Sequence, residues 1–162
     1  MVIAIQRPVL VKARVANFAA LTVVTKFCRA RHAESSWAEV PFNPVLFRKN
    51  LMLMVRTPGT DVLVVETEQG AVTGVLLASL EQLVFNKMVY ATDIHFMCTG
   101  GGIPLLAEFR RWAIEHHASK IIMGIANDDP SGRVHKFYEA MGMKPVGDAW
   151  VMDLADQQET VA

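Results

Sequence analysis

The sequence predicts an α/β domain built on a mixed central sheet of six to seven strands, with helices on both faces. Apolar residues make up 52% of the 162 residues and charged residues only 20%, which suits one domain with a sizeable core. Short β-branched runs alternate with stretches of helical periodicity. Three of these runs follow one another directly, as in an antiparallel meander, and a strand–helix–strand order comes after them.

The first third of the chain is predicted to form one strand and two helices. Residues 9–15 alternate and are β-branched, as in a strand. Asn17 suits the N-cap of a helix over residues 17–32. Asn43, which a proline follows, suits the start of a second helix over residues 43–56.

The middle of the chain is predicted to form the meander. Residues 61–82 contain two β-branched runs, and a Gln-Gly turn at Gly70 joins them. Residues 86–98 form the third run. Because each connection is short, we expect these strands to pair in sequence order and antiparallel.

The last third is predicted to alternate helix and strand. Residues 104–118 have helical spacing, residues 120–128 form a buried strand, and residues 131–142 form a short helix that ends at Gly142. Residues 144–154 close the chain as one or two strands. The strand–helix–strand part requires a parallel crossover, which makes the sheet mixed.

Composition excludes several classes of protein. Sixteen basic and sixteen acidic residues give a net charge of zero, and no basic stripe predicts a nucleic-acid partner. The basic pair Arg29 and Arg31 is interpreted as a solvated helix face. No apolar run reaches the roughly 18 residues that a membrane span needs, and the first residues lack the pattern of a signal peptide. We therefore expect a cytoplasmic protein without nucleic-acid or membrane partners.

The cysteines and the chain ends complete the domain organisation. Cys28 and Cys98 lie far apart and have no metal-ligand spacing, so we expect no metal and a reducing compartment. Residues 1–154 are predicted to form a single domain. Residues 155–162 form a polar tail.

Three consecutive glycines give the clearest functional signal. Gly100, Gly101 and Gly102 stand between a predicted strand and a predicted helix, with Pro104 in the first turn of that helix. A helix start carries unpaired N–H groups and a partial positive charge, and glycines let an anion approach them closely. The turn therefore suits a phosphate cradle. The alternative is a tight turn without a ligand.

Two familiar phosphate loops do not fit this turn. A P-loop needs a Gly-Lys-Ser/Thr sequence, and the turn has no lysine. A dinucleotide fingerprint needs a third glycine where Leu105 stands, and an acidic residue about 20 residues further on. A nucleotide-binding domain of another kind stays open as an alternative.

The order of elements and three short motifs resemble the GCN5-related N-acetyltransferase (GNAT) family. The stretch GGGIPLL resembles the family's glycine loop, FYEAMGM resembles its C-terminal helix motif, and GIANDD resembles its fifth strand. The resemblance extends over residues 9–154. Other segments look like a subgroup found in bacteria and tailed phages.

The resemblance implies transfer of an acetyl group from acetyl-CoA to an amine by direct attack. It assigns acetyl-CoA to the end of the fourth strand, the glycine turn and the C-terminal motifs. A backbone N–H near the strand end would polarise the thioester oxygen. The residues concerned are Phe96, Met97, Cys98, Gly100, Gly101, Gly102, Ile103, Pro104, Asn127 and Phe137.

The resemblance also suggests the groups that would move protons. Tyr138 occupies the position of the family's acid, and a phenol with an ordinary pKa near 10 can protonate a departing thiolate. His95 and Asp93 are predicted to share one face of the fourth strand, where a base is expected, and an imidazole titrates near neutrality. Glu66 is a weaker candidate for the base. The alternatives are a core aromatic for Tyr138 and an ordinary polar face for the strand residues.

The acceptor is predicted only by class, as an amine on a small molecule or a protein. Residues 33–43 and the turn over residues 80–87 are expected to set acceptor choice. Trp37, Phe42 and Phe85 either line an acceptor pocket or belong to the core or to a homodimer surface.

A second function stays open beside the enzyme. Met97 stands where the family has arginine or glutamine, and the segment before the glycines is shorter than usual. These departures predict, as the alternative, a GNAT-fold binding or structural protein without catalysis, with weak or no coenzyme A binding, encoded for example by a phage.

Overall fold

The structure is a computed structural model that describes residues 13–125 and 131–147. The chain divides into two compact units, with the boundary between Met123 and Gly124. Each unit is described by itself below. No helix among the described residues combines the length and the apolar character that crossing a membrane requires.

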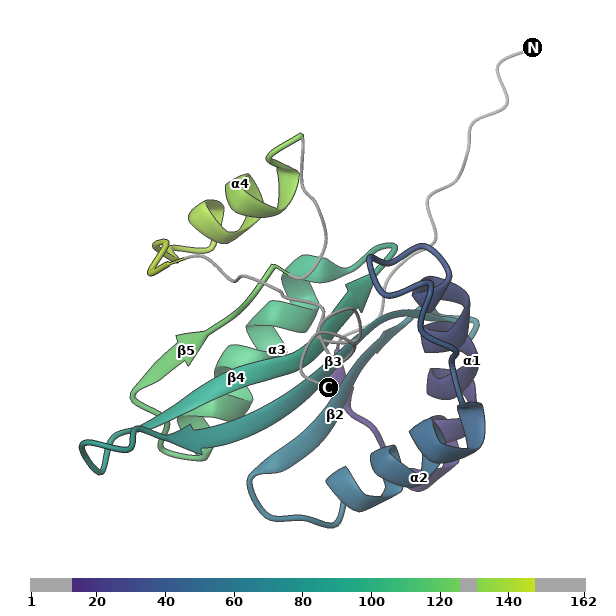
Figure 1. The fold of residues 1–162 in the computed structure, drawn as a ribbon, viewed down its shortest axis with the longest axis horizontal. Coiled ribbons are helices and arrows are strands. Elements are labelled where there is room, and N and C mark those ends of the chain that lie inside the picture. Colours follow the sequence, from purple (N-terminus) through teal and green to yellow (C-terminus); the bar gives the residue numbers. More distant parts are fainter. Residues whose placement is uncertain (1–12, 126–130, 148–162) are drawn as a thin grey trace, which may run out of the picture. The chain divides into compact units, whose positions relative to one another are not determined.

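The first unit contains one five-stranded sheet (Figure 1). Its strands are β1 (Arg14–Val15), β2 (Thr60–Glu66), β3 (Val72–Gln82), β4 (Val89–Cys98) and β5 (Lys120–Ile122). They lie side by side in sequence order. The first four pair antiparallel, and β5 pairs parallel to β4. The predicted meander and the mixed sheet are both confirmed.

The predicted number of strands is wrong for the part of the chain that the structure describes. It has five strands rather than six to seven. The expected closing strand begins at residues 144–147, which form no strand there. Pro145 in this stretch has no N–H group to donate to a neighbouring strand. The remainder of that segment, residues 148–154, lies outside the described residues.

Two helices cover one face of the sheet. A 3-10 turn (Phe18–Ala20) leads into α1 (Leu21–His32), and α2 (Pro44–Met54) follows. The side chain of Asn17 accepts a bond from the N–H three residues on, at 3.1 Å. The side chain of Asn43 accepts two such bonds, at 3.1 and 3.0 Å. Both predicted caps are therefore confirmed.

The core on this face joins both helices to the sheet. Buried side chains of α1 and one of α2 pack against alternate residues of β2 and β3. Alternation along a strand places every second residue on the same face. The strand residues of this cluster are Val62, Val64, Val75 and Leu77.

Helix α3 (Gly102–Glu115) packs against the sheet from the other face. Six of its residues are buried, and Trp112 and Phe109 are among the largest fully buried side chains of the described chain. The indole N–H of Trp112 donates to the Asp61 carboxylate of β2 at 2.7 Å. This helix connects β4 to β5, as the predicted parallel crossover requires.

The second unit contains α4 (Arg133–Ala140). Gly142 follows it with φ +81°, and the Met143 N–H donates back to the Tyr138 carbonyl at 3.0 Å. This left-handed glycine closes the helix as a Schellman motif, in agreement with the predicted helix end.

Candidate functional site

The predicted glycine turn lies between β4 and α3 and is tied to the neighbouring strand. The backbone N–H of Thr99 donates to the Thr73 carbonyl of β3 at 2.8 Å, and the Gly100 N–H approaches the same oxygen at 3.4 Å. Gly101 then adopts φ +78° and serves as the N-cap of α3. Only glycine takes this left-handed conformation without steric cost, so the second glycine is required by the backbone.

The first turn of α3 presents backbone donors beside these glycines. The first bond within the helix runs from the Leu105 N–H to the Gly101 carbonyl at 3.1 Å. The N–H groups of Gly102 and Ile103 therefore have no acceptor within the helix, and no side chain caps it. Pro104 has no N–H group. Two backbone donors and the positive end of the helix dipole are therefore available at this turn, and its use as an anion cradle stays a prediction.

Space and rigidity both favour a ligand at this turn. A Cβ atom added to Gly100 would meet nothing within 4 Å. A Cβ atom on Gly74 of β3 would lie 2.8 Å from Val65 and 3.1 Å from both Cys98 and Leu105. The floor of the turn is therefore closely packed, whereas its outer side is open.

Strand β4 is paired with β5 only over its first part. The parallel ladder joins residues 90–92 to residues 120–122, whereas β4 continues for six more residues to Cys98. The glycine turn therefore begins well beyond the end of this ladder.

A β-bulge interrupts β4 between Asp93 and His95, two of the predicted catalytic residues. Leu77 pairs with His95 and the next residue, Ala78, pairs with Asp93, so Ile94 is one residue too many for the ladder. The regular alternation on which the prediction of a shared face for Asp93 and His95 was based is therefore interrupted between them. A bulge re-aims nearby side chains, and it has no signal in a single sequence.

His95 lies opposite Leu77, whose side chain belongs to the core beneath α1 and α2. Burial lowers the pKa of His95, the nearby Asp93 carboxylate opposes this effect, and His32 lowers the pKa further. The imidazole is therefore uncharged at neutral pH and can accept a proton.

His32, at the end of α1, is a residue that the sequence did not single out. Its ring bonds the Val40 carbonyl at 2.7 Å and packs on Phe42, with 5.3 Å between ring centroids. These two contacts hold the connection between α1 and α2 against the end of α1. His32 also lowers the pKa of His95 through its charge. Only the fold brings these two histidines near each other.

Glu66, the weaker candidate for the base, is held in an ion pair. Its two carboxylate oxygens accept bonds from Arg14 of β1 at 2.9 and 3.0 Å. The pair joins neighbouring strands, which gives Glu66 a structural role.

Cys98 and Met97 lie at the end of β4. Cys98 is exposed, yet neighbouring atoms desolvate its thiol and raise its pKa. It is therefore protonated at neutral pH, which disfavours it as a nucleophile. Met97 packs against the core beneath α1 and α2, so the position that the resemblance matches to an arginine or glutamine is apolar here.

The remaining predicted residues belong to the second unit. The Tyr138 hydroxyl donates to the Gly124 carbonyl at 3.2 Å, and its ring lies 5.7 Å from that of Phe137. Asn127 lies outside the described residues. The predicted roles of these three residues therefore stay predictions.

The three aromatic residues predicted for an acceptor pocket do not come together. Phe42 packs on Phe47 at 5.0 Å within the helical layer, and Trp37 lies in the connection between α1 and α2. Phe85 is 79% exposed at the tip of the β3–β4 hairpin, at the opposite end of the sheet from that connection (Figure 1). A hollow of about 510 Å³ there is lined by residues 82–87 alone.

No group of three or more metal-ligating side chains occurs among the residues that the structure describes.

Among the comparisons with known proteins, the one with solved structures identifies the fold. No family model matches the sequence, and no curated protein matches it. A Trypanosoma brucei acetyltransferase is 16% identical, with a TM-score of 0.65 over 90% of this chain and 99% of that one. A Staphylococcus aureus GNAT family acetyltransferase is 14% identical, with a TM-score of 0.63 over the same shares. The ribosomal-protein-alanine N-acetyltransferase of Brucella melitensis is 12% identical, with a TM-score of 0.64 over 90% and 99%.

These matches cover nearly the full length of both chains at low sequence identity, so they bear on the fold. Together with the mixed sheet and the glycine turn before α3, they confirm the resemblance at that level. This chain has the fold of these solved acetyltransferases.

Proposed function

We propose that the protein transfers an acetyl group from acetyl-CoA to an amine. The observation that carries the proposal is the open glycine turn at the start of α3, on a fold whose solved examples include acetyltransferases. Acetyl-CoA supplies the acetyl group as a thioester, which an amine attacks directly.

The turn fits a pyrophosphate group by its backbone alone. Donors from Gly102 and Ile103 point out of the helix start, and the free space around Gly100 admits an anion. No cation occurs in residues 97–105. We therefore expect moderate affinity, because the positive end of the helix must serve in place of a cationic side chain.

His95 is the proposed base. It is uncharged at neutral pH, for the reasons given above, and can take the proton that an attacking amine must lose. The Asp93 carboxylate stabilises the imidazolium that this transfer creates. Both residues flank the bulge of β4.

The departing sulfur needs a proton, and the proposal assigns this role to Tyr138. The support is the resemblance of its segment to the family motif and the donor character of its hydroxyl. Backbone N–H groups of residues 96–98 are the proposed partners of the thioester oxygen. Asn127 and Phe137 stay proposed coenzyme contacts.

A second candidate function is a binding protein with the same fold and no catalysis. The apolar side chain of Met97, where the family has a polar or basic one, favours it. In that case the glycine turn would serve only to connect β4 and α3.

The test is the melting temperature with and without about 1 mM acetyl-CoA. A ligand present at 100 times its dissociation constant stabilises the fold by about 2.7 kcal/mol, which corresponds to several degrees for a domain of this size. Absence of any rise would contradict the enzyme and favour the binding protein.

Two variants at one position check where the ligand binds. Gly100→Leu places a side chain in open space, so the fold should tolerate it while the approach of phosphate is blocked. Gly100→Ala is the small control and should keep most of the shift. An unchanged acetyl-CoA shift in Gly100→Leu would show that the cradle is misplaced. Release of coenzyme A with a panel of amines, measured for the wild type and Tyr138→Phe, then tests catalysis.

A further inference from the structure

The outward side of α1 and α2, here called the outer helical face, carries cations that have no acidic partner among the residues placed by the structure. Neither helix contains an aspartate or glutamate. Five exposed cations lie on these helices or directly after α2, and none forms an ion pair with a described residue. They are Lys26, Arg29, Arg48, Lys49 and Arg56.

The zero net charge of the chain hides this asymmetry. Residues 17–56 hold six of the 16 basic residues and two of the 16 acidic ones, Glu34 and Glu39. Glu34 is paired with Arg31 at the end of α1. The helical layer is therefore positive, and the rest of the chain is negative by the same amount. Such a surface attracts anionic partners at long range.

Large apolar side chains lie among these cations. Val45, Leu46 and Leu53 of α2 are 79%, 53% and 63% exposed. Val45, Lys49 and Leu53 are spaced by four residues and form one ridge along the helix. Val23 of α1 is exposed as well. A ridge in which exposed apolar side chains flank a lysine is suited to contact a partner that is both apolar and acidic.

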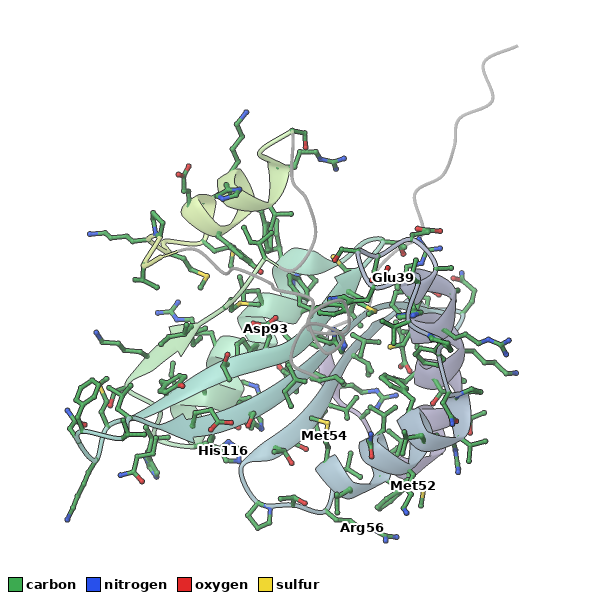
Figure 2. The ribbon with its side chains drawn as sticks, viewed as in Figure 1. Glu39, Met52, Met54, Arg56, Asp93 and His116 are labelled. Atoms are coloured by element: carbon green, nitrogen blue, oxygen red, sulfur yellow. The ribbon has the colours of Figure 1, made fainter. Side chains whose placement is uncertain are left out.

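Two of the arginines are held along the protein surface. The Arg48 guanidinium donates to the Thr22 hydroxyl of α1 at 3.3 Å and approaches the Met52 sulfur at 3.7 Å. The Arg56 guanidinium lies over the Phe18 ring, 4.9 Å from its centroid. Met52 lies along α2 and Arg56 at its end (Figure 2). These contacts hold two cations in place, and neither cation has a counter-ion in the part of the chain that the structure describes.

We propose that the outer helical face binds an acidic amphipathic helix of a protein partner. Apolar side chains of that helix would contact Val45 and Leu53, and its acidic side chains would meet Lys26, Arg48 and Lys49. Helices of 12 and 11 residues are about 18 and 16 Å long, which matches three to four turns of a partner helix. This mode is the helix-in-groove contact of amphipathic ligands.

Other occupants fit this face less well. A second copy in a two-fold contact would bring the same cations face to face. Nucleic acid would leave the exposed side chains of Val45 and Leu53 against phosphate, without aromatic side chains in the ridge for bases to stack on. A lipid surface favours interfacial tryptophan and tyrosine, and neither occurs in α1 or α2.

The experiment measures binding of a labelled helical peptide of about 18 residues, or about 27 Å, by fluorescence anisotropy. Leucines at helical i, i+3 and i+4 spacing form its apolar side and glutamates the rest. The wild type should bind it with an affinity that falls as salt rises. Lys26→Glu with Lys49→Glu should weaken binding at least about tenfold, through loss of attraction and new repulsion. Leu53→Ser should weaken it as well, with little dependence on salt.

Matched variants on other parts of the first unit provide the control. Arg110→Glu with Lys87→Glu makes the same charge change at two exposed sites, and Ile114→Ser removes an exposed apolar side chain of α3. Both should leave binding unchanged. The same peptide with lysine in place of glutamate should bind only the variant that combines Lys26→Glu with Lys49→Glu.

Several results would overturn the proposal. One is failure of the acidic peptide to bind the wild type. Another is weakening of its binding by the control variants as much as by the test variants. A third is equal binding of the acidic and the lysine peptide by the wild type. Tighter binding of phosphatidylserine vesicles or of duplex DNA, sensitive to the same two lysines, would replace the helix with that partner. The measurement involves no acetyl-CoA, so its outcome is independent of the proposed enzyme activity.

Discussion

The two faces of the sheet are covered in different ways. On one face the single helix α3 buries six of its 14 residues. On the other face α1 buries four of 12 and α2 buries one of 11, while three large apolar residues of α2 stay exposed. The densely packed helix begins at the glycine turn, and the loosely packed pair carries the positive outer face.

The two faces meet different structural requirements, one for a rigid helix start and one for an exposed contact surface. An anion cradle made of backbone N–H groups depends on a helix start that does not move, and deep packing of α3 supplies that rigidity. A surface that recruits a partner must leave apolar groups in solvent until the partner arrives.

The largest expected effect on stability comes from removing a buried side chain of α3 on the densely packed face. Trp112→Ala removes a fully buried ring and its bond to Asp61, so it should lower the free energy of unfolding by about 3–5 kcal/mol. The reference is Leu53→Ala on the exposed ridge, which should change it by less than about 0.5 kcal/mol. Urea unfolding measures both. Equal losses of unfolding free energy in the two variants would mean that Leu53 of α2 is buried in solution.

The next effect comes from crowding the floor of the glycine turn. Gly74→Ala places a Cβ atom 2.8 Å from Val65 and 3.1 Å from Leu105 of α3. Overpacking of this kind costs about 1–3 kcal/mol, and the shift of α3 should also reduce stabilisation by acetyl-CoA. Gly100→Ala, in open space, is the control for stability. A neutral Gly74→Ala would show that α3 adapts more easily than its burial indicates.

A smaller gain is expected at the far end of α3. His117 follows this helix with φ +59°, and the Ala118 N–H donates back to Ala113 at 2.9 Å. Gly142 holds the corresponding place after α4. A left-handed conformation costs a residue with a side chain about 1 kcal/mol. His117→Gly should therefore raise the melting temperature by a few degrees, and Gly142→Ala should lower it. A decrease for His117→Gly would assign the imidazole a stabilising contact of its own.

The smallest effect concerns pH and the side of the sheet beneath α1. The pKa of His95 is lower in the folded protein than in the unfolded chain. Between these two values the unfolded chain binds more protons, so stability rises with pH through this window and falls when pH drops from about 6.5. His95→Gln should flatten the dependence, as measured by melting curves between pH 5 and pH 8. The exposed His135→Gln is the control. An unchanged slope in His95→Gln would place the titration elsewhere.

Much of the fold could be predicted because its signals are local. Asn17 and Asn43 cap their helices through their own side chains, Gly70 and Gly142 adopt positive φ, and the glycine turn ends one strand and begins a helix. Each of these features depends on residues within one turn of the chain. The number of strands was less predictable, because a segment forms a strand only where it pairs with another segment that is distant in the sequence.

Neighbouring residues alone set the order of elements, the helix caps and the left-handed glycine turn before α3, because each of these depends on local backbone conformation. Tertiary structure alone decided the bulge at Ile94, the approach of His32 to His95 and the Arg14–Glu66 pair. It also separated the β3–β4 hairpin from the connection between α1 and α2 and left α2 with an exposed ridge. These features depend on strand register and on which helix face meets the sheet, and such contacts join residues that are far apart in the chain.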